Sequence, residues 1–152
     1  MSHLAFQSLY FEDLSVGMKE TYSKLVKSSD VVGFAELTGD RNPIQLSEHF
    51  AVKTPFGGRI AHGLYTAGLI SAVIGTRLPG PGAIYLSQTL RFNAPVRIGD
   101  TVEASVEVVE LIERGRRARL ACACRVGDVV VLEGEALVKI PARADAVKDS
   151  WD

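Results

Sequence analysis

Helix-type spacing of apolar residues fills the first half of the chain, and strand-type spacing fills the second half. Residues 19–27 predict a short strand. The polar residues 28–30 then suit the start of a helix that carries apolar residues up to Leu37 and stops at Gly39. Pro43 disfavours helical geometry at Asn42, so residues 40–43 are expected to form a turn. Ser47 can cap one further helical turn.

A segment without any Asp, Glu, Lys or Arg runs from Ile60 to Thr76. It falls just short of the ~18 apolar residues that a membrane span needs, and it contains polar residues and glycines. A helix that is apolar nearly all round is typically buried inside a soluble fold. We therefore expect a buried central helix. The first ten residues lack the basic and apolar regions of a signal peptide, which favours a cytoplasmic protein.

Four extended runs follow, at residues 83–93, 101–110, 117–126 and 129–140. The second run alternates, with Val102 and Ala104 on one face and Glu103 and Ser105 on the other. Short turns between the later runs force neighbouring strands to be antiparallel. A sheet with one apolar face needs a cover, and the charge-free helix is the candidate. The sequence predicts one α+β domain over residues 1–152, a sheet wrapped around a central helix, with a polar tail after about residue 141.

Composition narrows the function classes. The formal net charge of −1 over 152 residues gives no bulk attraction to nucleic acid or to an anionic membrane. Cys122 and Cys124 lie two apart in one extended run, so we expect reduced core residues rather than a disulfide or a metal site. Exposed strands at the sheet edges favour pairing of two copies as a homodimer or a higher homo-oligomer.

Two segments carry candidate chemistry: Gly39-Asp40-Arg41-Asn42-Pro43-Ile44-Gln45 places a carboxylate on a turn, and Arg59-Ile60-Ala61-His62-Gly63-Leu64 places a glycine where the central helix begins. Together they resemble the motifs of the MaoC-like, R-specific enoyl-CoA hydratases, which have the hot-dog fold. The resemblance extends over residues 10–141 and includes Leu78-Pro79-Gly80-Pro81-Gly82, Ile84-Tyr85-Leu86, Arg91-Phe92, Pro95-Val96 and Gly99-Asp100.

The resemblance implies reversible hydration of a trans-2-enoyl-CoA to an (R)-3-hydroxyacyl-CoA without a cofactor. Asp40 matches the carboxylate that activates water, and Gly63 matches the residue whose N–H faces the thioester oxygen. Asn42 matches the turn asparagine and Ser71 a small polar residue on the helix. We expect His62 to form a hydrogen bond near the helix start. We group Asn42, His62 and Ser71 as substrate-binding residues.

Gln45 stands where the family has its catalytic histidine, and Ser47 where an aspartate is common. Glutamine orients water but cannot relay a proton. If Asp40 alone serves as acid and base, we expect the hydration rate to be lower by roughly 10²–10⁴-fold. His49 is the nearest alternative imidazole. Two other functions therefore stay open: a non-catalytic acyl-CoA-binding protein or subunit, and a hot-dog thioesterase that directs water at the carbonyl carbon.

Two further features allow weaker predictions. The basic cluster Arg114, Arg116, Arg117 and Arg119 falls on a turn among acids and is interpreted as a solvated face, with a share in binding coenzyme A phosphates as the alternative. Bulky side chains on the central helix favour short acyl chains: Tyr65, Ile70 and Ile74.

Overall fold

The computed structural model describes residues 6–145. Five helical segments occupy the first half of the chain: η1 (Phe11–Asp13), α1 (Ser28–Thr38), α2 (Pro43–Leu46), α3 (Glu48–Ala51) and the central helix α4 (Gly63–Thr76). The strands are β1 (Lys19–Leu25), β2 (Ile84–Gln88), β3 (Arg91–Phe92), β4 (Thr101–Ile112), β5 (Arg117–Val126) and β6 (Val129–Lys139). A last short helix, η2 (Arg143–Asp145), follows. The expected polar tail lies largely outside the described residues.

All strands belong to one antiparallel sheet in the order β1-β4-β5-β6-β2, and β3 also pairs with β6. The long strands β4, β5 and β6 are joined by the tight turns that the sequence predicts at residues 113–116 and 127–128. The outer edges of this order are β1 and β2. The predicted antiparallel arrangement is confirmed.

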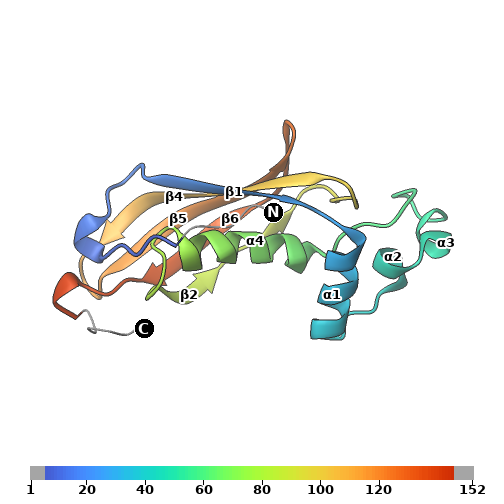
Figure 1. Cartoon of the computed structure of the whole chain (residues 1–152). Helices are drawn as coiled ribbons and strands as arrows, with labels where there is room; N and C mark the ends of the chain where they lie inside the picture. Colours follow the sequence, from blue (N-terminus) through green and yellow to red (C-terminus); the bar gives the residue numbers. More distant parts are fainter. Residues whose placement is uncertain (1–5, 146–152) are drawn as a thin grey trace.

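The apolar face of the sheet packs against α4, which lies along the sheet in Figure 1 while α1, α2 and α3 lie beyond one end. Strand β4 alternates as expected, with its inward residues Val102, Ala104, Val106 and Val108 buried. The buried face of α4 consists of Thr66, Leu69, Ile70, Val73 and Ile74. The predicted sheet wrapped around a central helix, the hot-dog arrangement, is therefore present (Figure 1). No helix in residues 6–145 is long and apolar enough to cross a membrane.

The central helix begins later than its composition suggests. Residues 60–62 are extended, because Ile60 bridges Arg97 and Ala61 donates its N–H to the carbonyl oxygen of Val96 at 2.7 Å. The helix therefore starts at Gly63, so the Ala-His-Gly motif leads into its first turn. This start agrees with sequence analysis, which placed Gly63 where the central helix begins. The bonds that keep residues 60–61 extended were not predicted, because their partners lie more than thirty residues away.

The run expected at residues 83–93 is two strands, β2 and β3. Between them Thr89 crosses close to β6, where its N–H donates to the carbonyl oxygen of Glu135 at 2.9 Å. A Cβ atom on Gly134 would lie 1.8 Å from the carbonyl oxygen of Thr89, so only glycine permits this approach. After this break Phe92 lies against Gly63 at the start of α4.

Candidate active site

The turn after α1 is built from local hydrogen bonds. Gly39 ends the helix in the left-handed conformation, at φ 81°, which glycine adopts without strain. The N–H of Asn42 donates to Oδ1 of Asp40 at 3.4 Å, and the N–H of Ile44 donates to Oδ1 of Asn42 at 3.1 Å. Asn42 thus caps the short helix α2, which sequence analysis missed. Its amide oxygen has this structural role, and the exposed Asp40 carboxylate is held beside it.

The first turn of α4 presents free backbone donors. The N–H groups of Gly63 and Leu64 have no acceptor within the helix, because they belong to its first turn. The helix dipole makes this end favourable for negative charge. Phe92 lies directly over Gly63, where a Cβ atom would come within 2.6 Å of the ring. Phe92 can lie this close to the backbone only because residue 63 has no side chain.

Hydrogen bonds join the turn to the segment that leads into α4. Arg59 donates from Nε to the carbonyl oxygen of Gln45 at 2.7 Å and from Nη1 to Oγ of Ser28 at 3.1 Å. The N–H of Ile60 donates to the carbonyl oxygen of Ile44 at 3.4 Å. The carbonyl oxygen of Asp40 is 2.9 Å from Nε2 of His62. The two sequence motifs are therefore connected directly to each other.

Both motifs open onto one cavity of about 520 Å³. Five of the six predicted site residues line it: Asp40, Asn42, Gln45, His62 and Gly63. Most of the remaining lining is apolar and suits an acyl chain: Phe56, Ile60, Ala61, Leu64, Phe92, Ala94, Pro95, Val96, Val131 and Leu132. A carboxylate, an amide and helix N–H donors thus meet at a mostly apolar cavity.

Gln45 contributes an unpartnered acceptor to this site. The residue is only 7% exposed, and its Oε1 has no hydrogen-bond partner among the described residues. The buried Thr66 lines the same cavity, and its Oγ1 is likewise without a partner there. Buried polar atoms are nearly always paired with protein or water, so these two atoms indicate a place for a ligand or water.

Other predicted participants lie away from the cavity. Ser71 is on the exposed face of α4, opposite the side that packs on the sheet, so its substrate-binding role stays a prediction. His49 is exposed and contacts Lys53 at 3.2 Å. The cavity lining does not include Tyr65, Ile70 or Ile74, so these side chains give no reason to expect short acyl chains.

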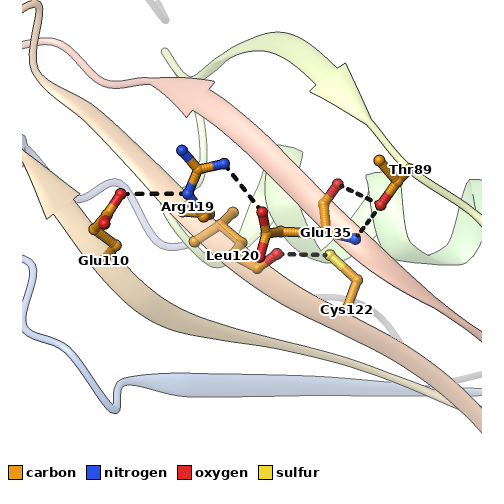
Figure 2. A network of polar contacts seen from close by, with 6 residues as sticks. All are labelled: Thr89, Glu110, Arg119, Leu120, Cys122 and Glu135. Atoms are coloured by element: carbon orange, nitrogen blue, oxygen red, sulfur yellow. Dashed lines mark hydrogen bonds and ion pairs between the residues drawn. The ribbon is translucent and has the colours of Figure 1, made fainter.

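Two of the four arginines in the basic cluster pair with acids. Figure 2 shows Arg119 between Glu110 and Glu135, with nitrogen–oxygen distances of 3.3 and 3.0 Å. Arg116 pairs with Asp145 at 2.7 Å. None of the four arginines lines the cavity, which agrees with their interpretation as a solvated face. In residues 6–145 no group of three or more His, Cys, Asp or Glu side chains is placed to hold a metal ion.

Several site residues were not found by sequence reasoning. Thr66 had a signal, because it is a polar residue on the buried face of an otherwise apolar helix. Arg59 and Phe92 fall within quoted motifs, but their roles were not predicted, since their contacts join segments that only the folded chain brings together.

The family model for the MaoC-like domain matches residues 14–127, so the chain belongs to the MaoC-like dehydratase family. It is 75% identical over 138 residues to a 3-hydroxybutyryl-CoA dehydratase of Methylorubrum extorquens, spanning 91% of this chain and 88% of the relative. It is 51% identical to an (R)-specific enoyl-CoA hydratase of Rhodospirillum rubrum, spanning 88% and 93%.

A solved structure has the same architecture. The unliganded R-hydratase PhaJ1 from Pseudomonas aeruginosa superposes with a TM-score of 0.86 at 41% identity, covering 91% of this chain and 89% of that one. The predicted family and hot-dog fold are confirmed.

Proposed function

We propose that this protein is an (R)-specific enoyl-CoA hydratase that reversibly adds water to a trans-2-enoyl-CoA. The observation that carries the proposal is the meeting of the Asp40 carboxylate and the first-turn N–H donors of α4 at one apolar cavity. The names of its close relatives, which include a dehydratase and a hydratase, support the same reaction.

Asp40 performs both proton transfers. The oxygen of water bonds to C3 of the enoyl group while one proton of that water passes to the carboxylate. The electrons of the C2=C3 bond shift toward the thioester and leave an enolate. Protonated Asp40 then gives its proton to C2, which restores the carboxylate. A single carboxylate acts from one side of the substrate, so water adds to one face, in the syn sense.

Gln45 and Gly63 assist without titrating. The unpartnered Oε1 of Gln45 accepts a hydrogen bond from the attacking water and so directs its oxygen at C3. The N–H of Gly63 donates to the thioester oxygen as negative charge develops there. Each step uses groups of this chain and the substrate alone, so we propose that no cofactor takes part.

The protein acts as a homodimer. Apolar side chains are exposed along the edge strand β2, at Ile84 and Leu86, and on α4 at Leu64. An exposed apolar edge strand favours pairing with another chain, and a second copy would also cover the free face of α4 that carries Ser71. The free thiols of Cys122 and Cys124 favour a cytoplasmic location.

Product analysis with crotonyl-CoA tests the proposal. We expect loss of the enoyl thioester with formation of 3-hydroxybutyryl-CoA, of which the (R) enantiomer predominates on chiral separation. Release of free coenzyme A, detected with a thiol reagent, would instead indicate a thioesterase. Binding of crotonyl-CoA without any product would indicate a non-catalytic acyl-CoA-binding protein.

A further inference from the structure

We propose that His62 is a positioning residue, whose Nε2–H holds the carbonyl oxygen of Asp40 and thereby fixes the Asp40 carboxylate relative to the first turn of α4. The inference rests on the proposed function, because it concerns the carboxylate that performs the proton transfers. It assigns His62 a role through Asp40 rather than through the substrate.

The hydrogen bond between His62 and Asp40 has one chemical direction. A carbonyl oxygen can only accept, so Nε2 of His62 carries the proton and donates across 2.9 Å. The other hydrogen bonds of Asp40 stay within its own turn, where its N–H donates to Oγ1 of Thr38 and its carboxylate accepts from Asn42. Within residues 6–145, the His62 bond is therefore the one that ties Asp40 itself to α4.

The imidazole ring is itself firmly held. His62 is 3% exposed, and its ring packs on Phe34 of α1 with ring centroids 4.7 Å apart and planes tilted by 46°. Its backbone forms the N-cap of α4, directly before Gly63. The ring thus links three parts of the site: α1, the Asp40 turn and the oxyanion donor. Because Phe34 and the start of α4 fix the ring, the ring in turn holds the Asp40 turn in a defined position.

Proton transfer through Nε2 does not fit the same geometry. Nδ1 of His62 is buried and has no hydrogen-bond partner among the described residues, while Nε2 is occupied by the carbonyl oxygen. Nε2 is therefore not free to exchange a proton with a substrate in the cavity. Arg59 holds the neighbouring carbonyl oxygen of Gln45, so loss of the His62 bond releases Asp40 more than Gln45.

Two substitutions separate positioning from packing. In His62→Gln the amide nitrogen lies the same number of bonds from Cβ as Nε2, and it keeps the donor. In His62→Asn the amide nitrogen is one bond shorter, at the place of Nδ1, and the donor is lost. Both remove the same ring from Phe34. A purely structural role therefore predicts equal effects on catalysis, whereas positioning predicts different ones.

With crotonyl-CoA we expect His62→Asn to lower kcat roughly 10²-fold, because misplacement of a catalytic group by about 1 Å reduces the rate by about that factor. KM should change by less than about threefold. His62→Gln should stay within about fivefold of the parent. If His62→Asn does not fold, His62→Met takes its place as the donor-free variant, because methionine fills the space without supplying a hydrogen-bond donor. Equal losses in the Gln and donor-free variants, or no loss in either, would overturn the proposal.

Hydrogen exchange of residues 40–45 gives a readout independent of turnover. We expect faster amide exchange in this segment for His62→Asn than for His62→Gln, since only the former frees the turn. If the parent chain does not hydrate crotonyl-CoA, the proposed function fails, and the exchange difference alone decides whether His62 holds the Asp40 turn. Equal exchange in the two variants would refute that tie.

Discussion

Adding one methyl group at Gly63 tests whether the start of α4 binds the thioester oxygen. A Cβ atom at this position would lie 2.6 and 2.8 Å from two ring carbons of Phe92, whereas ordinary contacts begin at 3.4 Å. The ring must therefore retreat by about 0.8 Å or more. Phe92 is 54% exposed, so we expect its ring to turn outward at a cost of about 1 kcal/mol.

The same substitution has little net effect on folding. Alanine in place of glycine in a helix gains up to about 1 kcal/mol, which offsets the displacement of Phe92. Gly63 and Phe92 both line the cavity, so we expect the added methyl group and the displaced ring to crowd the space beside the N–H donors. Loss of an oxyanion donor costs roughly 10²–10³-fold in kcat, or about 2.7–4 kcal/mol. We therefore expect Gly63→Ala to fold with nearly parental stability and to hydrate crotonyl-CoA roughly 10²-fold more slowly.

Initial rates with crotonyl-CoA and denaturant unfolding curves measure the two effects separately. Gly33→Ala is the matched control, because Gly33 lies inside α1 and a Cβ atom added there would meet no other atom within 4 Å. It should gain about 0.5–1 kcal/mol in unfolding free energy without any change in rate. A Gly63→Ala variant with kcat/KM within threefold of the parent would refute Gly63 as the oxyanion donor.

Three further changes have defined outcomes. Gln45→His should raise kcat at least about tenfold and make kcat depend on pH near the ordinary histidine pKa of ~6.5, which initial rates measured across pH would reveal. An unchanged pH–rate profile would show that residue 45 relays no proton. Gly134→Ala should lower the unfolding free energy by about 1–3 kcal/mol in urea, because its Cβ atom meets the Thr89 backbone; parental stability would contradict this. Burial raises the pKa of the Cys122 thiol from 9.0 to about 11 and that of Cys124 to about 12. Both thiols should therefore resist a thiol reagent at pH 8 until the chain unfolds, and unfolding free energy should fall as pH rises from about 9 through 11; rapid labelling of the folded chain would contradict their burial.

Much of the fold followed from local pattern. The alternation of Val102, Ala104, Val106 and Val108 identified the inner face of β4, and the absence of charge over residues 60–76 identified the central helix. The position of Gly63 at the start of this helix was also predicted correctly. The prediction of one strand over residues 83–93 was wrong, because the strand breaks where Thr89 meets Gly134 on β6, more than forty residues away.

The candidate site shows the same division. Motif resemblance brought Asp40, Gln45 and Gly63 together, and all three line one cavity. It did not reveal that His62 bonds to Asp40 or that Phe92 covers Gly63, because each contact spans more than twenty residues. Ser71 lies on the exposed face of α4, away from the cavity, so its substrate-binding role stays a prediction.

The central claim is that Asp40 is the base of an enoyl-CoA hydratase. The most direct test compares initial rates of crotonyl-CoA hydration by the parent chain and by Asp40→Asn, which keeps the size of the side chain and removes its charge. We predict measurable turnover by the parent and a loss of roughly 10²–10⁴-fold in the variant, with unchanged folding. A folded parent without turnover, or an Asp40→Asn variant as active as the parent, would contradict the account.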